Sequence, residues 1–172
     1  MNKVVIALTM AGALALSACA KKPPADIPQP PQSTVTPTPS TAVVPMPQGP
    51  QPGSQAHFAA EMSGADTIYF DTDKFNIDSE DAAALRRQAQ YMLTYATSRA
   101  TVEGHADERG TRDYNLALAE RRANAAKNYL VSLGIAENRL RTVSYGEERP
   151  ASMGSNEAAW ARNRRAVTVM IN

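Results

Sequence analysis

The residues best suited to chemistry are charged side chains gathered in one stretch, residues 102–126. Its sequence, VEGHADERGTRDYNLALAERRANAA, brings Asp107, Glu108 and Arg109 together in a polar run and places Arg122 further along. A carboxylate accepts hydrogen bonds and can bind an ammonium group, whereas a guanidinium presents a planar fork of donors that fits a carboxylate. If the fold brings Asp107 and Arg122 together, the stretch can bind a zwitterionic ligand.

The same side chains allow other interpretations. Judged by residue type alone, Asp107, Arg109 and Arg122 fit a solvated surface better than a binding site, because weak surface ion pairs are common. A glycosidase would use a pair of separated carboxylates, and the adjacent side chains of Asp107 and Glu108 usually point apart. We therefore expect no enzymatic activity.

His105 could suggest a metal ligand. The chain has one other histidine, His57, which precedes the main predicted elements, and its one cysteine lies near the N-terminus. A zinc site needs several such ligands close together. We expect a structural or gate-forming imidazole at His105, and no metal or other cofactor.

The polar run lies between an expected strand and an expected helix. A short β-favouring run at residues 100–103 leads into Gly104, and the sequence HADERGTRD then provides turn and helix-start residues. Gly134 and Ile135 fit a Schellman motif that ends the helix. Between these limits, apolar residues recur at steps of three and four, as on an amphipathic helix: Leu116, Ala119, Ala123, Ala126, Leu130 and Leu133.

The other elements predict an α+β fold. The order β-α-β-α-β-β implies a two-layer sandwich, with two main helices on one face of a mixed sheet. We expect a weak helix at residues 57–63, strands at 67–70, 140–145 and 165–171, a helix at 79–97 and a short helix at 156–162. The inward stripe of the helix at 79–97 should consist of Leu85, Ala89, Met92, Leu93 and Ala96.

The N-terminus has the pattern of an exported lipoprotein. Lys3 precedes a short apolar run, and the sequence LSAC ends at Cys19, which resembles the bacterial lipobox. We expect residues 1–18 to be removed as a signal peptide and Cys19 to carry acyl chains such as palmitate, which anchor a protein to a membrane. The residue after the cysteine is Ala20 rather than Asp. In lipoproteins of this kind, the absence of Asp at this position implies sorting to the outer membrane. The alternative is a plain secretory signal with an unmodified cysteine.

The segment after Cys19 is rich in proline. Eleven of the 12 prolines precede residue 55, and the segment has no apolar periodicity. Such a segment cannot bury enough apolar surface to offset the entropy of ordering. We expect residues 19–64 to comprise the lipidated cysteine and a disordered linker, and residues 65–172 to form one domain.

The charge balance argues against nucleic acid as a partner. The chain has 18 Lys and Arg against 17 Asp and Glu, and removal of Lys3 with the signal peptide makes the two numbers equal. A neutral chain lacks the positive surface by which proteins bind phosphate backbones.

Several motifs of the domain are distinctive. GHADERGT, the following YN and ERRANA, and later SYGEERP resemble the OmpA-like peptidoglycan-binding domain family. The resemblance covers about residues 67–171. It implies the same α+β fold that the element order predicts.

The resemblance also implies a ligand, the diaminopimelate of the peptidoglycan stem peptide, and roles for particular residues. Asp107 would bind the ammonium group and Arg122 a carboxylate, while the backbone at Thr72 and Asp73 would bind the other end of the ligand. Three more residues would line the pocket: Asn115, Leu118 and Arg164.

Two residues depart from the family pattern. Asn76 stands where an acid is common and Arg112 where proline is common, so both bear on the local conformation of the site loops. Glu108 and Arg109 would belong to a face that meets a protein partner.

The resemblance implies a non-catalytic lipoprotein that holds the outer membrane to peptidoglycan, with its domain in the periplasm. It also implies partnership with the Tol proteins, especially TolB, during cell division. The alternative function is a periplasmic adaptor whose main ligand is protein and whose contact with the cell wall is incidental.

Overall fold

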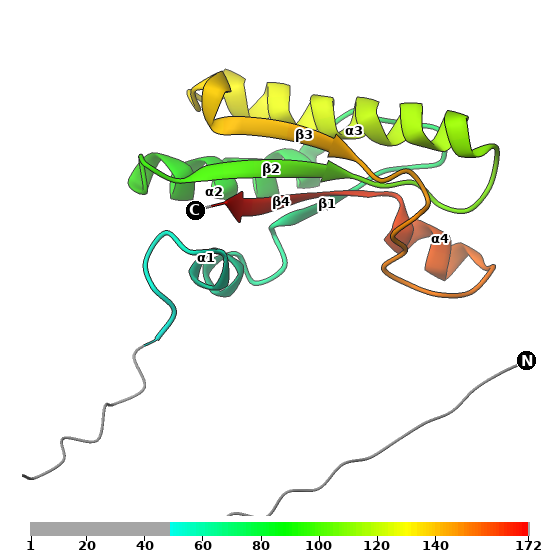
Figure 1. Ribbon diagram of the computed structural model, residues 1–172, viewed down its shortest axis with the longest axis horizontal. Coiled ribbons are helices and arrows are strands. Elements are labelled where there is room, and N and C mark those ends of the chain that lie inside the picture. Colours follow the sequence, from blue (N-terminus) through cyan, green and yellow to red (C-terminus); the bar gives the residue numbers. More distant parts are fainter. Residues whose placement is uncertain (1–48, 172) are drawn as a thin grey trace, which may run out of the picture. The chain divides into compact units, whose positions relative to one another are not determined.

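Four strands form one mixed sheet, and two long helices pack on one of its faces (Figure 1). The computed structural model describes residues 49–171. The expected signal peptide, Cys19 and most of the expected linker lie outside these residues. The predicted two-layer α+β architecture is confirmed.

The sheet has the strand order β1-β4-β2-β3. β4 pairs antiparallel with both β1 and β2, whereas β3 pairs parallel with β2. The strand bounds are β1 (Thr67–Tyr69), β2 (Arg99–Gly104), β3 (Leu140–Ser144) and β4 (Arg165–Ile171). Each matches a predicted strand to within one residue at either end.

Helix α2 (Ser79–Thr94) begins where Asp78 accepts a hydrogen bond from the backbone N–H of Asp81, at 2.8 Å. Three residues of its predicted stripe are buried: Leu85, Ala89 and Met92. The prediction for Leu93 is wrong, since this side chain is 50% exposed. At 3.6 residues per turn it lies about 80° around the helix from Leu85, at the border of the buried face. Ala96 is exposed because the helix ends before it.

Helix α3 (Arg112–Ser132) packs closely on the sheet because Gly104 has no side chain. A Cβ at Gly104 would lie 1.9 Å from the carbonyl oxygen of Ala119. The helix ends in the predicted Schellman motif: Gly134 has φ 98°, and the N–H of Ile135 donates to the carbonyl of Leu130 at 3.2 Å.

Helix α1 (Gln55–Met62) lies within the expected linker, yet it packs against the domain. Phe58 and Met62 are buried in the core. The side chain of Gln55 accepts a hydrogen bond from the N–H of Met170, at 2.7 Å, on the part of β4 that extends past its pairing with β1. Helix α1 therefore packs as part of the folded unit, although it precedes residue 65.

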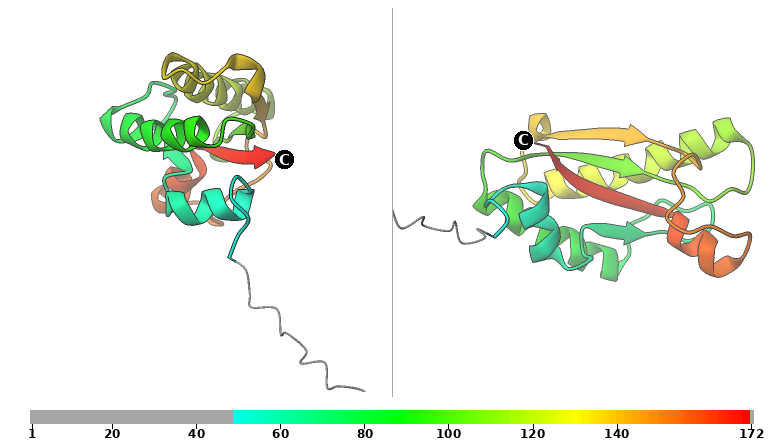
Figure 2. Two further views of the ribbon diagram at one scale, coloured as in Figure 1. Left: turned by 90° about the vertical axis from the view of Figure 1, so that its left-hand side faces the viewer. Right: turned by 60° about the horizontal axis from the view of Figure 1, so that its bottom comes forward.

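The loops that follow β1, β2 and β3 gather at one end of the sheet. Helix α4 (Glu157–Asn163), which precedes β4, lies at the same end (Figure 2). The opposite end holds α1 and the short 3-10 helix η1 (Glu137–Arg139). Within residues 49–171, none of the helices has the length and apolar character needed to cross a bilayer.

Candidate ligand-binding site

A pocket of about 290 Å³ lies at the sheet end where the loops gather. It is formed by the loop after β1, the loop between β2 and α3, the first turns of α3, and Arg164 between α4 and β4. All seven residues predicted to bind the ligand line this pocket: Thr72, Asp73, Asp107, Asn115, Leu118, Arg122 and Arg164. Their joint placement is a property of the fold, because they come from four separate segments.

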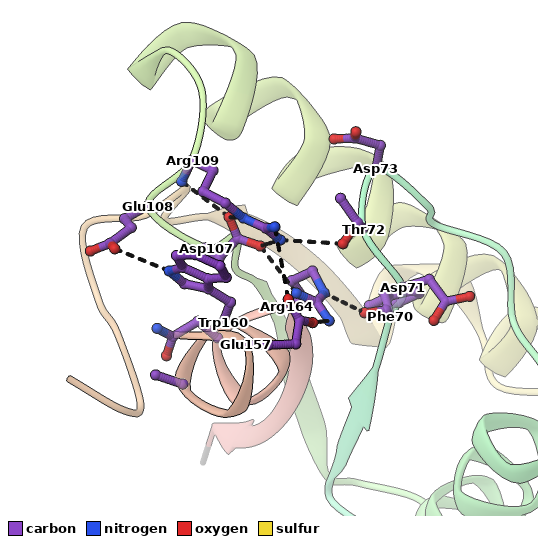
Figure 3. A network of polar contacts seen from close by, with 12 residues as sticks. Phe70, Asp71, Thr72, Asp73, Asp107, Glu108, Arg109, Glu157, Trp160 and Arg164 are labelled. Carbon is purple, nitrogen blue, oxygen red and sulfur yellow. Dashed lines mark hydrogen bonds and ion pairs between the residues drawn. The ribbon is translucent and has the colours of Figure 1, made fainter. Parts of the chain in front are cut away.

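Asp107 lies at the centre of a network of polar contacts (Figure 3). Its Oδ1 accepts hydrogen bonds from the backbone N–H and the Nε of Arg109, at 3.1 and 3.0 Å. Its Oδ2 accepts from Arg109 Nη2 at 2.7 Å and from Arg164 Nη1 at 3.3 Å. Burial raises the pKa of Asp107, but the hydrogen bonds from the two arginines outweigh it, so the net pKa lies below the ordinary value. The carboxylate is charged at neutral pH.

Arg109 lies at the rim of the pocket. Its guanidinium stacks over the ring of Trp160, with 4.3 Å between Cζ and the ring centroid, and Nη2 donates to Thr72 Oγ1 at 3.2 Å. Glu108 lies outside the pocket lining and accepts a hydrogen bond from Trp160 Nε1 at 3.0 Å. The two residues predicted to face a partner are therefore joined through Trp160.

Arg122 is fully buried and binds backbone carbonyls. Its Nε donates to Lys74 at 2.9 Å, Nη1 to His105 at 2.9 Å and Nη2 to Asp71 at 3.0 Å. Burial, with Arg164 nearby, lowers the pKa of Arg122 to about 10, so the guanidinium stays charged at neutral pH. It thus ties the loop after β1 to the end of β2, and three of its five N–H groups are used in doing so.

The loop after β1 is held in an unusual conformation. Asp73 has φ 57°, in the left-handed region that residues with a side chain rarely adopt. Two neighbouring carbonyls are bound by Arg122, and the carboxylate of Asp73 accepts a hydrogen bond from Tyr114 at 2.9 Å. These contacts fix the Thr72–Asp73 backbone at the mouth of the pocket.

Arg164 is buried and makes three kinds of contact. Its Nε donates to the carbonyl of Phe70 at 2.9 Å, Nη2 pairs with Glu157 at 2.7 Å, and Nη1 reaches Asp107. Together with Arg109 and Arg122 it gives the pocket three guanidinium groups, which lie near the carboxylates of Asp107, Asp73 and Glu157. The pocket therefore offers both donors for anionic groups and acceptors for cationic groups.

Asn115 and Leu118 form the wall that α3 contributes, and both are buried. The side-chain amide of Asn115 donates to the carbonyl of Arg109 at 3.1 Å and to the carboxylate of Glu147. Asn115 therefore holds the loop that carries Asp107, whereas Leu118 supplies an apolar surface.

The two departures from the family pattern lie near the pocket and outside its lining. Arg112 is the first residue of α3 and pairs with Glu148 at 2.6 Å. Asn76 is exposed on the segment that leads into α2. Neither side chain occupies the site.

His105 lies behind the pocket, buried and stacked on Tyr145 with ring centroids 5.5 Å apart. Burial and the nearby Arg165 and Arg149 lower its pKa to about 4, so it is neutral at physiological pH. Within residues 49–171 no group of acidic, histidine or cysteine side chains has the arrangement of a metal site. The imidazole acts as a packing group under the loop.

Three residues of the network were not predicted from the sequence: Tyr114, Glu157 and Trp160. For Trp160, its position as the single tryptophan of the chain, four residues before Arg164, is the signal that could have indicated a role. Glu157 and Tyr114 lie on helix faces whose direction the sequence does not specify.

Comparison with known proteins agrees with this description. The OmpA family model matches residues 69–164, more than half of the chain. Two peptidoglycan-associated lipoproteins are similar over 119 residues: that of Rhizobium meliloti is 51% identical and that of Mesorhizobium japonicum 50% identical. Both alignments cover 69% of this chain, and they cover 66% and 70% of the two relatives.

Solved structures give the same result. The crystal structure of the peptidoglycan-associated lipoprotein from Burkholderia pseudomallei superposes with a TM-score of 0.60 and 39% identity, covering 61% of this chain and 89% of that one. The C-terminal domain of MotB from Helicobacter pylori, 19% identical, covers 62% of this chain and 84% of its own with a TM-score of 0.57, which shows a shared fold. The chain belongs to the OmpA family, among its peptidoglycan-associated lipoproteins.

Proposed function

We propose that the domain binds peptidoglycan without catalysis, through the diaminopimelate of the stem peptide. The observation that carries this proposal is the pocket in which Asp107, Arg122 and Arg164 lie together with the Thr72–Asp73 backbone. Family membership supports peptidoglycan as the ligand, since the similar proteins are named peptidoglycan-associated lipoproteins.

The charges of the pocket fit a group of this kind. The free end of diaminopimelate carries an ammonium and a carboxylate on one carbon, so recognition needs an acceptor and a donor close together. Asp107 supplies the acceptor. Arg122 and Arg164 supply the donors, and their guanidinium groups bind carboxylates in a planar, two-pronged manner.

The size of the pocket fits one residue of the wall. A volume of about 290 Å³ lies at the lower limit of small-molecule sites, which span roughly 300–1,000 Å³. Such a space accommodates the end of a single amino-acid side chain, whereas a whole sugar-peptide unit is too large for it. The rest of the stem peptide would lie along the rim, past Arg109 and the loop after β1.

We further propose that the domain works from the outer membrane, in the periplasm. Acylation at Cys19 would anchor the chain, because each buried methylene group of an acyl chain contributes roughly 0.8 kcal/mol. A proline-rich spacer between the anchor and the first helix of the domain gives reach, up to about 3.1 Å per residue when extended. The protein would thereby hold the membrane to the wall.

A protein partner of the Tol system, TolB, would meet the same end of the domain. Glu108, Trp160 and Arg109 form a connected group at the rim of the pocket, and this group would be shared between TolB and the wall. Calorimetry that detects TolB and a wall fragment bound to one domain at the same time would contradict this overlap.

Sedimentation with isolated sacculi tests the proposed function. The mature chain carrying Cys19→Ser, which removes the acyl chains, should sediment with sacculi of the diaminopimelate type. The same chain with Asp107→Asn should stay in the supernatant. If the unaltered pocket also fails to sediment, peptidoglycan is not the ligand and the adaptor function is favoured.

A further inference from the structure

The acceptor proposed for the ligand's ammonium group is already occupied by the protein itself. A carboxylate has about four lone-pair positions for hydrogen bonds. Asp107 uses four, with three donors from Arg109 and one from Arg164. An incoming ammonium group therefore has to displace a guanidinium before it can bind Asp107.

Arg109 is the donor that can leave. Its side chain is 37% exposed, whereas that of Arg164 is 7% exposed and is also bound to Phe70 and Glu157. Arg109 also has neighbours to turn toward. Its Nη1 lies 3.8 Å from Glu157, and the Trp160 ring supports the guanidinium on one face.

Displacement has an electrostatic consequence that depends on the ligand. A simple amine would neutralise Asp107 and leave three guanidinium groups, those of Arg109, Arg122 and Arg164, near the two remaining carboxylates of Asp73 and Glu157. A group that carries both an ammonium and a carboxylate would bind Asp107 through its ammonium. Its carboxylate would then take the place of Asp107 as the partner of Arg109. One ion pair within the protein would then become two between protein and ligand.

We propose that Arg109 makes the pocket select a zwitterionic group over a simple amine, by occupying the ammonium position at Asp107 until a ligand supplies a carboxylate in exchange. The inference rests on the proposed function, since it concerns the same pocket. The alternative is that Arg109 only fixes the conformation of the loop that carries Asp107. In that case its removal would change all affinities alike.

The two accounts differ in how Arg109→Met changes selectivity. Two wall peptides serve as probes, identical except that one has diaminopimelate and the other lysine, which lacks the terminal carboxylate. Calorimetry with the mature Cys19→Ser chain should show that Arg109→Met binds the lysine peptide about ten-fold more tightly than the unaltered pocket does. Affinity for the diaminopimelate peptide should change by less than about three-fold. Arg109→Met removes the group that competes with the ligand for Asp107, but it also removes the group that binds the ligand's carboxylate, and the two effects offset each other.

Two further variants serve as controls. Arg112→Met removes an exposed arginine that pairs with Glu148 outside the pocket, so it should leave both affinities unchanged. Arg109→Lys keeps the charge and should keep most of the selectivity. Thermal unfolding of all three variants checks that they are folded.

A measurement on the unaltered pocket does not depend on any variant. The Arg109 Nε–H resonance should move when the diaminopimelate peptide binds, because this N–H leaves Asp107. The inference would be overturned, while the proposed function stands, if this resonance does not move. It would also be overturned if the ratio of affinities for the diaminopimelate and lysine peptides is the same in Arg109→Met as in the unaltered pocket. Failure of the unaltered pocket to bind the diaminopimelate peptide would overturn the proposed function, and the inference with it.

Discussion

The two ends of the sheet are built around the same device, an arginine that gathers backbone carbonyls. At the pocket end Arg122 donates to three carbonyls from two loops: Asp71, Lys74 and His105. At the opposite end Arg139 donates to three carbonyls near the end of α2: Met92, Tyr95 and Ser98. Both side chains satisfy groups that would otherwise be costly to bury.

The ends differ in what surrounds the arginine. Arg139 lies beside an apolar region in which α1 packs Phe58 against Tyr91, with ring centroids 5.0 Å apart. Arg122 lies beside Asp107, two further arginines and an open pocket. An arginine that binds carbonyls is thus a structural feature of both ends, and the charged pocket beside Arg122 distinguishes the end that we propose binds the ligand.

Phe58→Ala tests the apolar end and should have the largest effect. Truncation of a fully buried phenylalanine costs about 3–5 kcal/mol, because it removes apolar contact and leaves a cavity. The midpoint of thermal unfolding should fall by more than 10 °C or so. Sedimentation with sacculi, measured below that midpoint, should be unchanged. A chain that melts like the parent would show that α1 does not belong to the folded unit.

Arg122→Met and Arg139→Met form a matched pair for the two ends. Each removes three hydrogen bonds to carbonyls, but Asp71 keeps the N–H of Lys74 and Tyr95 keeps the N–H of Ser98 as donors, so two carbonyls are left without a donor in each variant. An unsatisfied buried group costs about 1–3 kcal/mol, so both variants should lose about 2 kcal/mol or more of unfolding free energy. Arg122→Met should also lose binding of the diaminopimelate peptide, whereas Arg139→Met should keep it. Equal loss of binding in the two variants would mean that Arg122 acts only by holding the fold.

Much of the fold could be predicted because its signals are local. β4 was predicted to the residue, and the Schellman end at Gly134 follows from two neighbouring residues. The burial of α1 depends on contacts with α2 and β4, which its own weak pattern does not encode. Leu93 was misplaced because a residue at the edge of a helical stripe can face either way.

The candidate site could be predicted only in part. Family motifs indicated Asp107 and Arg122, and the fold places both in one pocket. The structural role of Arg122 depends on carbonyls that lie 17, 48 and 51 residues away in the chain, a distance over which sequence patterns carry no signal. The same holds for Glu157 and Trp160, which reach the site through α4.

Asp107→Asn should affect binding more than stability. Loss of one charge-assisted contact costs roughly 1.5–3 kcal/mol, so affinity for the diaminopimelate peptide should fall about ten-fold to a hundred-fold or more. Because the folded pKa of Asp107 is lowered, its contribution to stability is present above pH 3.8 and is lost as the pH falls through the folded pKa. The variant should therefore lose less stability than the parent as the pH falls below 3.8.

Asp81 provides the opposite case among the buried aspartates, and its effect should be the smallest. It lies at the start of α2, away from any arginine pair, with Oδ1 accepting from the Tyr69 N–H at 3.1 Å. Within residues 49–171, Oδ2 has no hydrogen-bond partner. Burial raises the pKa of Asp81; the Tyr69 hydrogen bond opposes the rise, and the charge of Asp78 adds to it.

Because the pKa of Asp81 is raised on folding, the folded state favours the protonated form. The charged carboxylate therefore lowers the free energy of unfolding at pH values above the folded pKa. This loss is recovered as the pH falls toward 3.8. Asp81→Asn keeps the acceptor for Tyr69 and removes the charge. It should therefore raise the free energy of unfolding at pH 7, with the gain disappearing below pH 3.8. The gain should be small, because a helix N-terminus favours a negative charge by about 0.3–1 kcal/mol. Denaturant unfolding from pH 3 to 7 measures both curves. A variant less stable than the parent at pH 7 would show that Asp81 is bound by an attractive partner, as Asp107 is.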